Sequence, residues 1–170
     1  MNHYFEIVTQ FINRHSRYLP FATWLTGFLL SFCFLRVDNV FREWLIAALN
    51  STPSVCFRFI SVSAPLIIFY IFTLFHYKFL VLLFLFLKAF AHGILWSMVL
   101  TCFPSNGWLI GLLLLFSENF SIIFFLIYSF GYFSSHKTLT VQQMLFGLLS
   151  LLIISFVDYS FVAPILTSNF

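Results

Sequence analysis

Long apolar runs separated by short polar breaks dominate this chain. A transmembrane helix needs about 20 apolar residues to cross a hydrocarbon core of roughly 30 Å. Turn-forming segments such as residues 76–78 (HYK) and 103–107 (FPSNG) divide the apolar sequence into pieces of that length. The pattern predicts an all-α, polytopic integral membrane protein, with residues 18–170 forming one transmembrane domain of about five spans: about 18–35, 57–75, 79–102, 108–133 and 141–166.

Two regions depart from simple spans. Residues 1–17 have apolar side chains at helical spacing and a basic end, which predicts an interfacial amphipathic helix. A second short amphipathic stretch is expected at 38–49. The fourth span is longer than one untilted crossing requires, and Ser117, Glu118 and Asn119 interrupt its middle. It is either one tilted helix or a re-entrant half helix followed by a shorter one, because protein or a wet cavity can surround irregular backbone.

Composition agrees with a membrane location and excludes other classes. Hydrophobic residues make up 62% of the chain and charged residues 8%, which is incompatible with a soluble globular domain. The net charge of +3 comes from scattered basic residues, so nucleic-acid binding has no support. The distribution of basic residues among the loops favours a cytoplasmic N-terminus and, with five spans, an external C-terminus, whereas six spans would put both ends inside. The three cysteines, Cys33, Cys56 and Cys102, lack metal-like spacing and are expected to be small buried hydrophobes.

Polar residues inside the spans are the candidate functional site, because charge is costly in lipid. Lys88 lies near the middle of the third span, and His92 follows one helical turn later on the same face. Glu118 is the expected partner of Lys88, since the turn at 103–107 folds the fourth span back along the third. Counted from that turn, their depths differ by roughly 7 Å at 1.5 Å per residue. The pair is either a structural link between helices or a working proton or substrate site. The set comprises Lys88, His92, Glu118, Asn119 and Asp158.

Other residues give weaker signals. Arg58 is expected to snorkel from the entry of the second span to the membrane surface. Asp158 is expected near the interface or bonded to a neighbouring helix, and a catalytic pair of Glu118 with Asp158 has only spacing in its favour. His92 alone is more often a hydrogen-bonded core residue than a ligand. The sequence contains no hydrolase, metalloprotease or nucleotide-binding motif, so neither enzyme activity nor a cofactor or metal is expected.

Three segments carry a family resemblance. Residues 86–93 (FLKAFAHG), 107–123 (GWLIGLLLLFSENFSII) and 152–164 (LIISFVDYSFVAP) resemble successive spans of the stage II sporulation protein M family. The likeness covers most of the chain from about residue 18. Here Ala89 replaces the family's usual glycine, and Glu118 stands where a glutamine is usual. Sporulation members have a longer external segment than residues 36–56 provide.

The resemblance implies a non-enzymatic subunit of a multiprotein membrane complex. Short family members accompany an ABC-type ATPase in clusters that make circular bacteriocins, which implies maturation or export of a hydrophobic peptide. The partners are then other membrane subunits, the ATPase, the peptide and the lipid bilayer. The ATPase is expected to engage two cytoplasmic turns, which contain His76, Tyr77 and Lys78 in one and His136 and Lys137 in the other. The alternative is a sporulation scaffold that recruits peptidoglycan hydrolases through residues 36–56.

Overall fold

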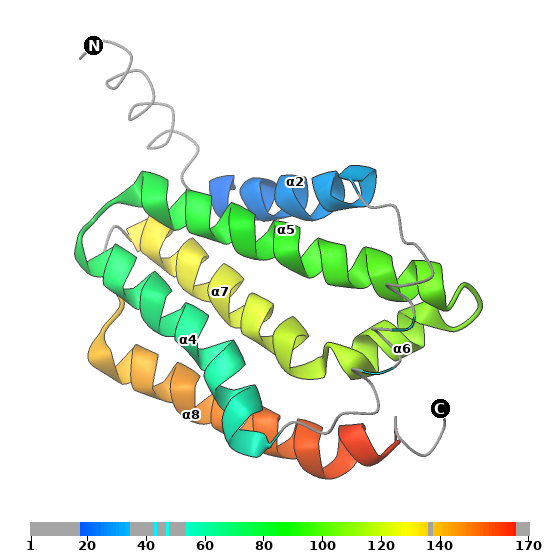
Figure 1. The fold of residues 1–170 in the computed structure, drawn as a ribbon. Coiled ribbons are helices and arrows are strands. Elements are labelled where there is room, and N and C mark those ends of the chain that lie inside the picture. Colours follow the sequence, from blue (N-terminus) through cyan, green and yellow to red (C-terminus); the bar gives the residue numbers. More distant parts are fainter. Residues whose placement is uncertain (1–17, 35–42, 44–46, 48–53, 136–137, 166–170) are drawn as a thin grey trace.

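The computed structural model describes residues 18–34, 43, 47, 54–135 and 138–165. These residues form helices joined by short connections and contain no strand (Figure 1). The predicted amphipathic segment 1–17, most of the stretch 38–49, and the turn residues His136 and Lys137 lie outside the described residues. The helices are α2 (Leu19–Phe34), α4 (Val55–Leu74), α5 (Lys78–Cys102), α6 (Gly107–Leu114), α7 (Phe116–Ser135), α8 (Val141–Val157) and the π-helix η1 (Asp158–Val162).

The helices confirm an all-α polytopic membrane protein. Within the described residues, four helical segments are long and apolar enough to cross a membrane by length and composition: 55–74, 78–102, 116–134 and 141–165, the last of which includes α8 and η1. The first predicted span corresponds to α2, an apolar helix of 16 residues, whose length of about 24 Å falls short of a full hydrocarbon core. α2, α4, α5, the α6–α7 pair and α8 run in alternating directions, so the α4–α5 turn, the end of α7 and the start of α8 lie at one end of the bundle (Figure 1). The α5–α6 turn lies at the other end.

Small residues let α2 pack closely on α5. A Cβ atom added to Gly27 would lie 2.7 Å from the Phe86 carbonyl oxygen, and one added to Gly93 would lie 2.1 Å from Ser31 Oγ. Gly27 and Ser31 are four residues apart on α2, as are Ala89 and Gly93 on α5. Each helix thus presents a small-xxx-small stripe, the pattern that brings membrane helices into backbone contact. Without a strong hydrophobic drive between helices in lipid, this close packing holds α2 in place.

Aromatic residues fill the centre of the bundle between α4, α5, α7 and α8. Phe69 and Phe125 are buried, with ring centroids 5.6 Å apart in an edge-on arrangement. Phe84 meets Phe125 in the same way at 5.8 Å. Such pairs contribute about 0.5–1.5 kcal/mol beyond the area they bury. The large Phe content of the sequence therefore serves interhelical packing as well as contact with lipid.

The fourth predicted span divides at Leu115, where α6 ends and α7 begins in a changed direction (Figure 1). The segment is therefore two helical pieces, but it differs from both expected forms: α6 has eight residues, and the helix that follows it, α7, is the longer one with 20 residues. Asn119 explains part of the break: its Nδ2 donates to the Leu112 carbonyl oxygen at 3.4 Å. That carbonyl belongs to the last turn of α6, where an ending helix leaves its acceptors unpaired. The side chain therefore satisfies backbone that the break exposes.

The last span also changes geometry, at Asp158. From there to Val162 the backbone is π-helical, and the Ala163 N–H bonds the Asp158 carbonyl five residues back. Pro164 follows directly and has no N–H to continue the regular α-helical pattern. Short π segments inside helices are frequent at functional sites, and this one begins at the acidic residue of the span.

Candidate functional site

Three consecutive residues in the first turn of α7 each bond a different part of the bundle. Ser117 reaches the last span, Glu118 reaches the middle of α5, and Asn119 reaches both α5 and the end of α6. Consecutive positions on a helix differ by about 100° in direction, because one turn takes 3.6 residues. These three polar side chains, which follow the helix break at Leu115, therefore point in different directions and reach different neighbouring helices. We call Ser117, Glu118 and Asn119 the α7 hub.

Lys88 and Glu118 form the predicted ion pair. Lys88 Nζ lies 2.7 Å from Glu118 Oε2, and the two side chains are 18% and 21% exposed. The depth difference expected from a continuous helix does not prevent contact, because the chain changes direction at Leu115 before it reaches Glu118. A charge-assisted bond of this length offsets part of the cost of placing both charges in an apolar surrounding.

His92 and Asn119 are linked through a residue that the sequence interpretation missed. The indole Nε1 of Trp96 lies 3.0 Å from His92 Nε2 and 3.2 Å from Asn119 Oδ1, and its single proton is shared between these two acceptors. His92 is only 4% exposed, which confirms it as a hydrogen-bonded core residue. Since an indole only donates, Nε2 of His92 carries no proton in this arrangement. Trp96 follows His92 by four residues on the same helical face, and this spacing was the available signal.

Arg58 does not snorkel to the surface as a solitary flank; that prediction was wrong. Its Nη1 lies 2.7 Å from Asp158 Oδ2, and the Asp158 side chain is 5% exposed. Ser117 Oγ donates to the same oxygen at 2.6 Å. A carboxylate this deeply buried needs compensation, and the basic side chain from α4 supplies it. Asp158 is thus bonded to neighbouring helices, which was one of the two placements expected for it.

The α7 hub connects the two ion pairs through adjacent residues. Glu118 belongs to one pair, and Ser117 donates to the carboxylate of the other. Each carboxylate is bound by its own cation, so Glu118 and Asp158 are not arranged as a shared acid pair. The arrangement fixes α4, α5, α7 and the last span relative to one another. Any movement of the α6–α7 break must strain or exchange these bonds.

Several buried polar atoms around the hub have no hydrogen-bond partner within the described ranges. They include Asp158 Oδ1, Arg58 Nε and Ser155 Oγ, and on the other side His92 Nδ1. Ser155 precedes Asp158 by three residues and shares its helical face. Buried polar groups are normally paired, and two of these unpaired atoms belong to the Arg58–Asp158 ion pair itself.

The expected partner-contact turn is only partly described. His76 adopts a left-handed backbone with φ of 55°, which closes the tight turn between α4 and α5. Tyr77 is exposed, and its ring stacks on Phe75 with centroids 6.3 Å apart. Lys78 begins α5 at the same end of the bundle.

Cysteine placement corrects one expectation. Cys102 is buried, whereas Cys33 and Cys56 are exposed on the outside of the helices. All three are free thiols. Among the residues that the structure describes, no group of three or more His, Cys, Asp and Glu side chains could hold a metal ion.

Comparison of the chain with protein-family models, with curated proteins and with solved structures gives no match. The resemblance to the stage II sporulation protein M family therefore stays a prediction that rests on the three sequence segments alone.

Proposed function

We propose that this protein is a non-enzymatic subunit of a multiprotein complex in a bacterial cell membrane. Its proposed role is maturation or export of a hydrophobic peptide, such as a circular bacteriocin, together with an ABC-type ATPase. The α7 hub is the observation that carries the proposal. It places two ion pairs at a helix break inside the bundle, where a partner's movement can be transmitted between helices without any chemistry by this chain.

The positions of the helix ends support an ATPase that binds at one end of the bundle. The α4–α5 turn lies at the same end of the bundle as the end of α7 and the start of α8 (Figure 1). A partner that binds this end contacts the first residues of α5 and the last residues of α7. Lys88 lies farther along α5, and Glu118 lies in the first turn of α7, at the opposite end of that helix. Force on either helix reaches the Lys88–Glu118 pair along a rigid element. With a cytoplasmic N-terminus, this end faces the cytoplasm.

Purification from the native host tests the proposed complex. The tagged protein is extracted in mild detergent, and bound molecules are identified by mass spectrometry. We expect an ATP-binding subunit and a small hydrophobic peptide. Recovery of cell-wall hydrolases in their place would contradict the proposal and favour the sporulation scaffold.

Variants of the hub test its part in the function. Lys88→Met combined with Glu118→Met removes both charges and leaves no unpaired ion, so the protein is expected to remain folded. We expect peptide production to fall at least about tenfold while the protein level in the membrane stays unchanged. Ala91→Met places a similar side chain on the exposed side of α5 and is the matched control. Normal peptide production by the double variant would show that the ion pair has no working role.

A further inference from the structure

Two adjoining hollows lie between α7 and α8 near the connection of these helices. One has a volume of about 480 Å³ and the other about 300 Å³, and both are lined by Tyr128 and Gln143. Ligand sites in proteins are commonly about 300–1,000 Å³. Because they share lining residues, the hollows form one continuous depression, which we call the α7–α8 groove. It lies apart from the α7 hub and takes no part in the function proposed above.

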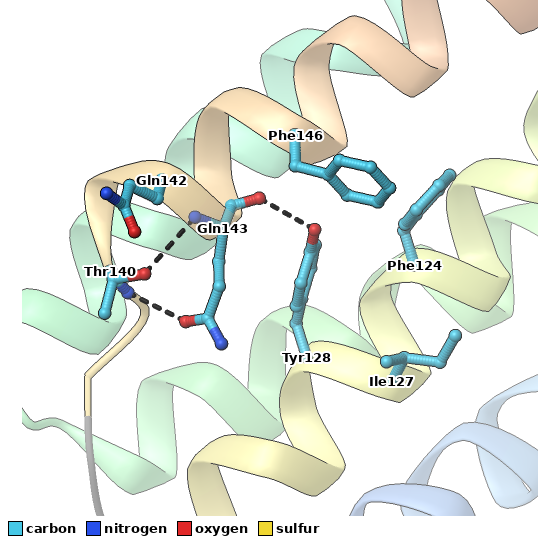
Figure 2. Close-up of a pocket in the computed structure, with 7 residues that line it drawn as sticks. All are labelled: Phe124, Ile127, Tyr128, Thr140, Gln142, Gln143 and Phe146. Atoms are coloured by element: carbon cyan, nitrogen blue, oxygen red, sulfur yellow. Dashed lines mark hydrogen bonds between the residues drawn. The ribbon is translucent and has the colours of Figure 1, made fainter.

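The groove changes from apolar to polar along its length. The Phe146 ring is directed toward Phe124 in the part farther from the start of α8, and Thr140 and Gln143 lie where α8 begins (Figure 2). Ile127 also lines the groove. The start of α8 is the end of a membrane-spanning segment, so the polar part lies at the membrane surface and the aromatic part within the hydrocarbon. This order matches a molecule with a polar end and an apolar tail.

Hydrogen-bonding groups remain available at the polar end. Thr140 and Gln143 form a capping box, in which the Thr140 N–H donates to Gln143 Oε1 at 2.9 Å and the Gln143 N–H donates to Thr140 Oγ1 at 3.2 Å. That leaves the Gln143 amino group for a guest. Gln142 is exposed beside it and offers both an amide donor and an acceptor. These groups suit ester carbonyl and glycerol oxygens.

The two tyrosines that line the smaller hollow hold their hydroxyl groups in different surroundings. Tyr132 lines it and is 3% exposed, and its hydroxyl has no hydrogen-bond partner in the described part of the chain. The neighbouring Tyr128 hydroxyl, in contrast, donates to the Gln143 carbonyl oxygen at 2.8 Å. The Tyr132 hydroxyl is enclosed by protein and out of reach of a molecule in the groove, so the polar contacts of the groove come from the amides of Gln142 and Gln143.

The length of the groove fits one leaflet of a bilayer. Its α7 residues extend from Phe124 to Tyr132, which corresponds to about 12 Å of helix at 1.5 Å per residue. Half of the roughly 30 Å hydrocarbon core is about 15 Å. An acyl chain that lies along the groove therefore remains within the leaflet to which its polar end belongs.

We propose that the α7–α8 groove binds one membrane glycerolipid. One acyl chain lies against Phe124, Ile127 and Phe146, and the ester and glycerol region bonds the amides of Gln142 and Gln143. The described lining residues carry no charged side chain, and the ligand group that we propose they recognise is the ester and glycerol region that glycerolipids share.

Gly131 allows a direct test. It lines the groove, and a Cβ atom added there meets nothing within 4 Å, so the position accepts a side chain and a leucine adds bulk at the groove wall. The purified full chain is incubated with dioleoyl phosphatidylethanolamine or dioleoyl phosphatidylglycerol, and native mass spectrometry counts the lipids retained. We expect one retained lipid per chain, equal occupancy by both lipids within about twofold, and about tenfold weaker retention by Gly131→Leu.

Ala91→Leu is the matched control, because it adds the same bulk to an exposed position on α5 and is expected to keep the lipid. If Gly131→Leu does not fold, Gln142→Leu tests the polar end separately and is expected to weaken retention of both lipids. If the groove variants retain as many lipids per chain as Ala91→Leu does, the lipids bind nonspecifically to the outer surface of the protein, and the proposal is overturned. Retention of phosphatidylglycerol alone would overturn it too, since charge would then decide binding.

Discussion

Asp158 is held by two side chains that lie far from it in the sequence. Arg58 supplies charge and Ser117 supplies a hydroxyl proton, and both reach the same carboxylate oxygen. Inside a membrane bundle, the cost of each charge is offset only while its partner stays in place. Single and paired substitutions at these positions should therefore have opposite consequences.

Arg58→Met leaves the Asp158 carboxylate buried without a cation, and we expect a loss of about 3–5 kcal/mol in stability. Arg58→Met combined with Asp158→Leu removes both charges and should recover most of that loss. Titration with sodium dodecyl sulfate, followed by circular dichroism, measures the unfolding midpoint of each variant. If the double variant is less stable than Arg58→Met, the pair is not the source of the effect.

The two ion pairs differ in how far the sequence predicts them. Lys88 and Glu118 flank one tight turn, so the expected antiparallel return of the chain brings them together. Arg58 and Asp158 lie on spans separated by the whole of α5, α6 and α7, and apolar periodicity sets no register between such spans. Trp96 was missed for another reason: aromatic residues are so frequent in this chain that one hydrogen-bonding indole does not stand out.

At the scale of the helix, close packing stabilises the contact between two helices, whereas capping stabilises the end of a single helix. The α2–α5 contact depends on glycine where backbones approach, whereas α8 begins with side-chain bonds from Thr140 and Gln143. The helices themselves were predictable from apolar run length. The sequence leaves two alternatives for the fourth span, because residues 117–119 signal an interruption but neither its position at Leu115 nor its geometry.

Gly93→Ala should separate α2 from α5. The new Cβ would lie 2.1 Å from Ser31 Oγ and 2.7 Å from the Phe28 carbonyl oxygen, and the second of these atoms cannot move without the helix. We expect a loss of about 1–3 kcal/mol, read as a lower unfolding midpoint. Gly131→Ala is the control, because its Cβ meets open space. Equal midpoints for the two variants would refute close packing at Gly93.

Thr140→Ala removes the side-chain acceptor of the Gln143 N–H at the start of α8. Loss of such a cap costs about 1 kcal/mol, so we expect amide hydrogen exchange across the first turn of α8 to rise about fivefold. Exchange measured by mass spectrometry in lipid nanodiscs checks this expectation. Protection of α5 should not change, and a general rise in exchange would indicate unfolding of the bundle instead.

For the whole molecule, the alternating directions of the helices place the connections at two ends (Figure 1). Composition and apolar spacing were sufficient to predict this class of fold. They do not determine which faces of the helices meet, because nearly every face is apolar. Contacts such as the Phe69, Phe84 and Phe125 cluster therefore emerge only in three dimensions.

Cysteine labelling tests the arrangement of the ends. Cys33, Cys56 and Cys102 are first replaced by alanine, and Tyr77→Cys and Ser105→Cys are then made as two separate variants. Each variant has one exposed thiol, and the two thiols lie at opposite ends of α5. We expect a membrane-impermeant maleimide to label only one of them in intact cells, and both after the cells are opened. Labelling of both in intact cells would mean that α5 does not cross the membrane.

The Arg58–Asp158 contact also has a consequence for biosynthesis. The residue that neutralises Arg58 emerges from the ribosome about a hundred residues later, which takes about 5–20 seconds at roughly 5–20 residues per second. During that interval Arg58 must remain near lipid headgroups or water, or be shielded by the insertion machinery. The N-terminal end of α4 can therefore reach its final depth in the membrane only after the last helix has been inserted. Assembly of the first half of the bundle is thus completed only when the second half is in place.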